Sequence, residues 1–190
     1  MRPTQSVRTS KFRGSSILFL ILLSSLLMPV EVTIIPNFYL MQRLGWTDSH
    51  LPLIIIPIFG AQSVTATFIV RQFFLSFPRE LEEAAMLDGL GRFGIYWRIA
   101  LPIAKPILGT VAILSFLYSW NAFLEPLIYI DSREKFTLPL SLQSFTDSYG
   151  LPLWHLQLAA TTLSVIPILI VYVVAQKQIV DSFAQSGIKG

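Results

Sequence analysis

Four long stretches of the 190-residue chain are mainly apolar and carry no charged side chain. A helix needs about 20 mostly apolar residues to cross the hydrocarbon core of a bilayer. The stretches lack the strict alternation of barrel strands, and lipid offers the backbone no hydrogen-bond partner, so each one predicts a helix. The charge-free stretches are Gly14–Val30, Ser49–Val70, Pro106–Leu124 and Ser148–Gln176. The expected membrane spans built on them are about residues 14–30, 49–70, 104–124 and 154–176, with Lys105 at the cytoplasmic end of the third.

The first stretch allows a second interpretation. Its strongly apolar part, Ile17 to Met28, follows a basic N-terminus, as the hydrophobic region of a secretory signal peptide does. No small-x-small cleavage site follows, because the sequence continues Met28-Pro29-Val30-Glu31. We therefore interpret this stretch as the first span.

Composition points to a membrane protein as well. Hydrophobic residues make up 53% of the chain and charged residues 13%, about half of the share found in soluble domains. The mean hydropathy is +0.63. These values exclude a disordered chain and an ordinary cytosolic domain. The chain has no cysteine, which excludes disulfides, a thiolate nucleophile and Cys-based metal sites.

The basic residues lie mainly in alternate loops. Eleven of the 14 precede the first span, lie between the second and third, or follow the fourth, whereas Arg43, Arg133 and Lys135 lie in the other loops. The positive-inside rule therefore places both termini, including segment 1–13, and the middle loop in the cytoplasm. The sequence pI near 9.3 thus reflects topology, and no nucleic-acid partner is expected.

The two extracytoplasmic loops differ in character. Residues 31–48 remain apolar, and we expect them to follow the membrane interface, where Tyr39 and Trp46 suit the headgroup zone. Pro36 is taken as a break within this loop. Residues 125–147 contain turn-forming and polar side chains.

The cytoplasmic loop between the second and third spans contains nine of the 25 charges in 35 residues, Arg71 to Lys105. Pro78 suits the first turn of a helix, and Gly89 can supply the left-handed residue that ends it. A second short helix is expected to run to Pro102. The first helix should place four residues on one face, where two alanines let another surface approach closely: Leu81, Ala84, Ala85 and Asp88. Physics alone also allows a hairpin that only joins two spans.

The spacing of residues in this loop favours a more specific interpretation. Glu83-Ala84-Ala85 is followed by three residues, Gly89, nine residues and then Ile99-Ala100-Leu101-Pro102. This pattern resembles the EAA signature of permease subunits of binding-protein-dependent ABC importers, and it matches every fixed position.

Other segments resemble the carbohydrate-importer branch, similar to the maltose and glycerol-3-phosphate permeases. They are Arg71-Gln72-Phe73-Phe74, Pro78 to Glu82, Trp120-Asn121, Thr137-Leu138-Pro139 and Gly187 to Gly190.

Two departures from the family pattern matter. Ala122 stands where an acidic residue is expected after Asn121, while Glu125 follows four residues after Asn121. Family members usually have six spans, and this chain begins just before what would be the third. An inactive truncated permease and a misassigned start are therefore both open.

The resemblance implies an all-α integral membrane protein with the helix bundle of a type I ABC importer transmembrane domain, over residues 14–190. Loop 71–103 would couple to a cytoplasmic ATPase, with Glu83 as the charged contact. The C-terminal Lys189-Gly190 would reach the same partner, or would be a frayed tail. The implied coupling residues are Glu83, Ala84, Ala85, Asp88, Gly89, Ile99, Leu101 and Pro102.

Polar residues within the spans are candidates for the solute path, because their burial in lipid is costly. Gln62, Asn121 and Glu125 are the ones we single out. Asn121 and Glu125 would lie one helical turn apart on a shared face. His50 and His155 have no second ligand at metal spacing, so no metal site is expected.

The predicted function is thus a permease subunit of an ATP-driven importer for a sugar or sugar-like solute in a prokaryotic plasma membrane. The resemblance implies a second permease subunit, ABC ATPase subunits, a solute-binding protein and lipid as partners, with no cofactor. The alternative is a secondary transporter or channel, although the spans offer no paired ionisable groups for it. A membrane enzyme is not expected, since no catalytic motif is visible.

Overall fold

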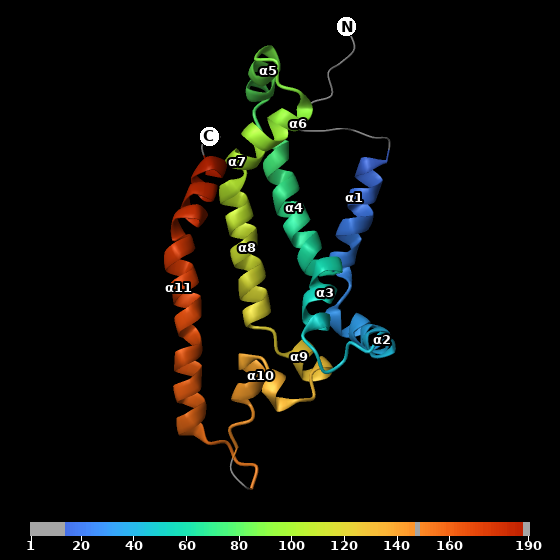
Figure 1. The fold of residues 1–190 in the computed structure, drawn as a ribbon, viewed down its shortest axis with the longest axis vertical. Helices are drawn as coiled ribbons and strands as arrows, with labels where there is room; N and C mark the ends of the chain where they lie inside the picture. Colours follow the sequence, from blue (N-terminus) through green and yellow to red (C-terminus); the bar gives the residue numbers. More distant parts are fainter. Residues whose placement is uncertain (1–13, 147–148, 188–190) are drawn as a thin grey trace. The chain divides into compact units, whose positions relative to one another are not determined.

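The computed structural model describes residues 14–146 and 149–187, and the regular secondary structure among them is helical, which confirms the all-α class. The expectations for segment 1–13 and for Lys189-Gly190 lie outside the described residues. The elements are α1 (Ser15–Ser24), η1 (Ser25–Leu27), α2 (Val30–Arg43), α3 (Leu51–Phe59), α4 (Ala61–Leu75), α5 (Arg79–Leu87), α6 (Arg92–Ile95), η2 (Tyr96–Ala100), α7 (Leu101–Ile103), α8 (Lys105–Trp120), α9 (Leu124–Tyr129), η3 (Arg133–Lys135), α10 (Leu138–Leu142) and α11 (Trp154–Gly187) (Figure 1).

The chain divides into two compact units, each assembled from separate parts of the sequence. Of the described residues, unit 1 contains 14–27, 64–112 and 177–187, and unit 2 contains 28–63, 113–146 and 149–176.

Many apolar side chains of the long helices are exposed. Helix α11 over Trp154–Gln176 is long and apolar enough to cross a membrane by itself, and up to four segments qualify if each bent pair of helices is one span. Val173 and Val174 in α11 are mostly exposed, as is Ile17 in α1. Helices that are apolar all round are stable when lipid, and not water, surrounds them.

Unit 1 contains the packing of α1 on α4. The rings of Phe19 and Phe68 stack with centroids 6.3 Å apart, and the Arg71 guanidinium carbon lies 3.9 Å from the centre of the Phe19 ring. Beyond α4 the core of the unit includes Ile95, Ala100 and Ala104, all fully buried. The best-packed part of unit 1 is therefore the loop that the sequence singled out.

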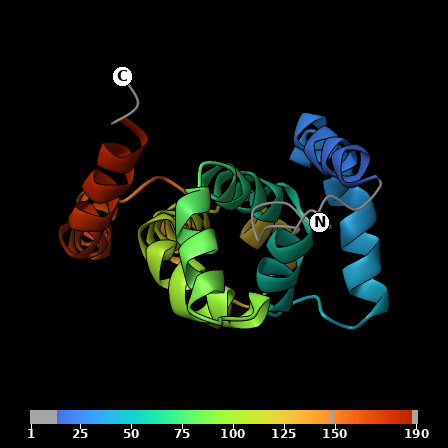
Figure 2. The same cartoon turned by 90° about the horizontal axis from the view of Figure 1, so that it is seen from above.

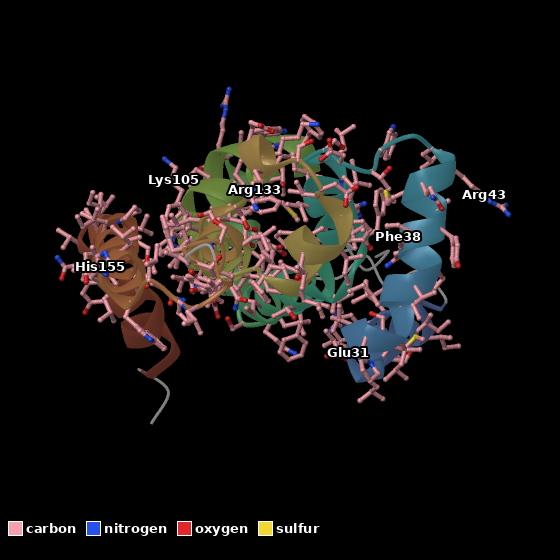
Figure 3. All side chains as sticks on the ribbon, turned by 90° about the horizontal axis from the view of Figure 1, so that it is seen from below. Glu31, Phe38, Arg43, Lys105, Arg133 and His155 are labelled. Carbon is pink, nitrogen blue, oxygen red and sulfur yellow. The ribbon has the colours of Figure 1, made fainter. Side chains whose placement is uncertain are left out.

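Unit 2 is centred on the short helix α9. Tyr129 at its C-terminal end and the following Ile130 are buried, and α9 contacts α2 and α3. The ring of Phe38 from α2 stacks on Tyr129 with centroids 6.3 Å apart. Figure 3 shows Phe38 on the side of α2 that faces this part of the unit, while Arg43 points away.

Two features differ from the sequence-based expectation. Pro36 lies inside α2 and does not break it, so residues 30–43 form a helix where a loop was expected. The second apolar stretch is divided at Gly60 into α3 and α4, where the carbonyl oxygen of Ile56 leaves no space for a Cβ atom.

Candidate functional site

The EAA helix is the nine-residue α5, and its start follows from local chemistry. Pro78 occupies the N-cap position with φ of −63°, and the helix begins at Arg79. Glu80 and Glu82 lie in the first turn, where the partial positive charge of the helix N-terminus favours carboxylates. Figure 1 shows α5 and α6 as two short helices beyond the end of α4, and Figure 2 gives the same elements from above.

The end of α5 is a Schellman turn that requires glycine. The Leu90 N–H donates to the Ala85 carbonyl (3.0 Å), and the Gly89 N–H donates to the Met86 carbonyl (3.1 Å). These are the 6→1 and 5→2 bonds of this motif, and Gly89 has the left-handed φ of 79° that it needs. The structure therefore confirms that Gly89 ends the helix. Asp88 is the C-cap residue and is exposed.

The Ile99-Ala100-Leu101-Pro102 part of the motif forms an unusual joint. Tyr96–Ala100 is π-helical, and the Leu101 N–H donates to the carbonyl of Tyr96, five residues earlier. Pro102 has no N–H, so a regular α-helical bond at its position is impossible, which favours irregular winding nearby. Ile99 and Leu101 are half-buried, while Pro102 is exposed. The sequence predicted the helix but not its π stretch.

Burial separates the two alanines of the motif. Glu83 and Ala84 are exposed, whereas Ala85 is 3% exposed and Glu82 is 2% exposed. Contrary to the expectation, Ala84 and Ala85 therefore do not share one accessible face. Ala85 lies on the buried side of α5 together with Glu82, three residues earlier. Only Ala84 of the pair is accessible to another protein.

Large apolar side chains of α5, α6 and η2 are exposed as well. Leu87 is 89% exposed, Phe93 78% and Trp97 54%, and the rings of Phe93 and Trp97 lie 6.3 Å apart. The sequence pattern predicted a helix through Phe93 and Trp97 but did not indicate that both side chains are exposed. We call Glu83, Ala84, Leu87, Phe93 and Trp97 the α5–α6 face. Exposed apolar surface that is rimmed by polar residues is typical of sites that contact a protein or a membrane.

The residues proposed for the solute path all lie in unit 2. The Gln62 amide donates to the Ser115 hydroxyl (3.4 Å), which links α4 to α8. The Asn121 amide donates to the Leu117 carbonyl of its own preceding turn (2.7 Å). Glu125 accepts a hydrogen bond from the Tyr118 hydroxyl (3.0 Å).

The expected helical turn between Asn121 and Glu125 is wrong. Helix α8 ends at Trp120, and Glu125 lies in the separate helix α9, which begins at Leu124. The Asn121 amide donates to the Leu117 carbonyl, one of the last carbonyls of α8, which have no partner within the helix. Asn121 therefore caps α8 at its C-terminal end.

Side chains that could bind a metal ion are not grouped in the described part of the chain. No group of three or more His, Cys, Asp or Glu residues there could hold a metal ion. The His50 ring nitrogen instead forms a hydrogen bond with the Lys135 carbonyl at 2.9 Å.

Comparison with known proteins identifies the family. The family described as "Binding-protein-dependent transport system inner membrane component" matches residues 7–184. The chain belongs to this family. Its fold is accordingly the type I transmembrane fold of ABC importer permeases, and members of the family work together with other ABC components.

Curated relatives of this inner membrane component are sugar-type permeases. The arabinooligosaccharides transport system permease protein AraQ of Bacillus subtilis (strain 168) is 36% identical over 183 residues, 94% of this chain and 62% of AraQ. The sn-glycerol-3-phosphate transport system permease protein UgpE of Yersinia enterocolitica is 33% identical over 93% of this chain and 62% of UgpE. The chain thus spans less than two thirds of the length of these relatives.

A solved structure shares the fold of this inner membrane component. A chain of a bacterial ABC transporter involved in the import of the acidic polysaccharide alginate superimposes with a TM-score of 0.72 at 25% identity. The match covers 90% of this chain and 64% of that one.

Proposed function

We propose that this inner membrane component is a permease subunit of an ATP-driven, binding-protein-dependent importer of a sugar or sugar-like solute. The observation that carries the proposal is the α5–α6 face, which presents Glu83 and Ala84 beside exposed Leu87, Phe93 and Trp97. The relatives named for arabinooligosaccharides, glycerol 3-phosphate and alginate support the solute class.

The α5–α6 face docks into a cytoplasmic ABC ATPase. Glu83 supplies a charged contact, Ala84 lets the partner backbone approach closely, and the exposed rings of Phe93 and Trp97 bury apolar area on binding. Asp88 and Gly89 form the turn that ends α5 and leads into α6. ATP hydrolysis takes place in the partner, so this chain makes and breaks no covalent bond.

The joint at Ile99, Leu101 and Pro102 transmits movement of the ATPase to the spans. Ile95, Ala100 and Ala104 around the joint are fully buried, and close-packed interiors transmit displacement because they hardly compress. The helix pair Arg92–Ile103 and Lys105–Trp120 is bent by 62°, so tilting of α5 and α6 acts on α8 as a lever. The ATPase thereby biases a two-state element, as allosteric coupling requires.

Solute passes the polar groups of unit 2. Gln62, Asn121 and Glu125 offer amide and carboxylate groups that can exchange hydrogen bonds with sugar hydroxyls. The complete transporter contains a second permease subunit and an extracytoplasmic solute-binding protein. Both termini of this chain and the α5–α6 face lie in the cytoplasm, as the distribution of basic residues indicates.

The experiment is copurification of the membrane-embedded chain with the ABC ATPase co-expressed with it. Glu83→Arg should weaken the complex, whereas Glu134→Arg, at an exposed site in η3, should not. If the Glu83 variant retains the ATPase as well as wild type does, the docking role is lost. Uptake that persists on an ion gradient without ATP would instead identify a secondary transporter.

A further inference from the structure

A network of hydrogen bonds around Asp48 joins two loops of unit 2 that are distant in sequence. One carboxylate oxygen of Asp48 accepts the N–H groups of Asp131 (3.0 Å) and Ser132 (2.8 Å). The other accepts the Ser132 hydroxyl (2.6 Å) and the Lys135 ammonium (2.7 Å). The Lys135 ammonium also donates to the Asp48 carbonyl (2.6 Å). We call these contacts the Asp48 clasp.

Backbone contacts extend the clasp to helix α9. The Asp48 N–H donates to the carbonyl of Tyr129, the last residue of α9, at 2.7 Å. Two residues after Asp48, the His50 ring bonds the Lys135 carbonyl. The loop between α2 and α3 is therefore attached at several points to the segment that follows α9.

The backbone conformation of Asp48 is unusual for a residue that is not glycine. Among the described residues, Asp48 alone has a positive φ without being glycine, at 52°. An L-residue adopts this region at a cost, which is smaller for Asp and Asn because their short polar side chains can bond neighbouring groups. An exposed ion pair alone contributes little, so it is the two backbone donors and the Ser132 hydroxyl that make this arrangement specific.

Helix α9 connects the clasp to the proposed solute path. It has six residues, with Glu125 in its first turn and Tyr129 at its end. Only about 6 Å of helix rise separates these two residues, and both Pro126 and Tyr129 are buried, so α9 moves as one piece. A displacement at the clasp would therefore displace Glu125 and its contact with Tyr118.

We propose that Asp48 is a positioning residue that, by fastening the loop after α2 to the segment after α9, sets the position of Glu125. This inference rests on the proposed function for the role of Glu125, whereas the clasp itself can be tested without it. Asp48 need not touch solute.

The first measurement reports the position of α9 in the assembled transporter in proteoliposomes. Because the chain has no cysteine, spin labels can be placed at Arg43→Cys in α2 and Leu127→Cys in α9, both exposed. Asp48→Ala should broaden or shift the distance distribution between the labels. Asp131→Ala is the matched control, since it removes a neighbouring carboxylate but retains the backbone N–H that the clasp uses. An unchanged distribution in Asp48→Ala overturns the positioning role.

The second measurement is a double-mutant cycle on uptake, with arabinooligosaccharide, glycerol 3-phosphate and alginate oligosaccharide as probes. Asp48→Ala should raise the KM by roughly fivefold with Glu125 present, a size typical of coupled residues. The increase should nearly vanish in a Glu125→Gln background, and Asp48→Asn, which keeps an acceptor oxygen and tolerates a positive φ, should restore part of the loss.

The outcomes separate the two claims. Equal increases in KM with and without Glu125 show that Asp48 does not act through it. If Glu125→Gln alone leaves uptake of every probe unchanged, the proposed solute path is wrong, whereas the distance measurement still decides the clasp.

Discussion

The turn after α5 provides a sharp test, because two neighbouring glycines differ mainly in backbone conformation. A Cβ atom at Gly89 or at Gly91 would meet no atom within 4 Å, so neither substitution by alanine creates a clash. Gly89 has φ of 79°, however, while Gly91 has φ of −72°. Any difference between the two variants therefore reports the left-handed conformation itself.

The magnitude follows from that conformation. Holding an L-residue in the left-handed region costs about 1–2 kcal/mol. Gly89→Ala should lower the free energy of local opening of the turn by this amount, which corresponds to a roughly 5–30-fold change in an equilibrium constant. Gly91→Ala adopts its native φ without strain and should be neutral or stabilising by up to about 1 kcal/mol, since it restricts the unfolded chain.

The assay is amide hydrogen exchange of the peptide that contains the Gly89 and Leu90 N–H groups, which close the Schellman turn. Their exchange should accelerate in Gly89→Ala by the factor given above and should not accelerate in Gly91→Ala. Equal acceleration in the two variants would refute the reasoning, because the positive φ would then not be the cause.

Three further predictions concern other sites. The Lys135 ammonium, the Ser132 hydroxyl and the backbone N–H groups hold the pKa of Asp48 well below its usual range. The stability that this carboxylate contributes is therefore complete above pH ~4 and is lost as the pH falls further. Asp48→Asn should accordingly reduce the fall of the melting temperature at acid pH. Ala85→Leu should cost about 1–3 kcal/mol by overpacking a buried site, whereas Ala84→Leu should leave thermal melting unchanged and weaken binding of the ATPase. Tyr118→Phe removes the hydroxyl that donates to Glu125. Because this bond helps to hold Glu125 in the proposed solute path, the KM for uptake should rise, while ATPase binding stays as in wild type.

Much of the fold follows from patterns that are local in sequence. Apolar composition and the position of Gly89 predicted helices and the end of α5, because lipid requires helices and a Schellman turn requires a left-handed residue. The π stretch at Tyr96–Ala100 was not predictable, since its winding depends on how the core around Ile95 and Ala100 packs.

The candidate sites were predictable only in part. Spacing identified Glu83 and Ala84, but the burial of Ala85 depends on the packing of α5 against the rest of its loop. The Asp48 clasp joins residues more than 80 positions apart, and no periodicity in the sequence indicates which polar side chains of two loops will meet.

The central claim is that the α5–α6 face of this chain contacts an ABC ATPase. The most direct measurement introduces Glu83→Cys into the cysteine-free chain, attaches a photoactivatable cross-linker and illuminates membranes that contain the co-expressed ATPase subunit. We predict a covalent adduct between the two proteins from Glu83→Cys and none from Glu134→Cys, which is also exposed. The account is contradicted if Glu83→Cys is labelled but gives no adduct, or if both positions give it equally.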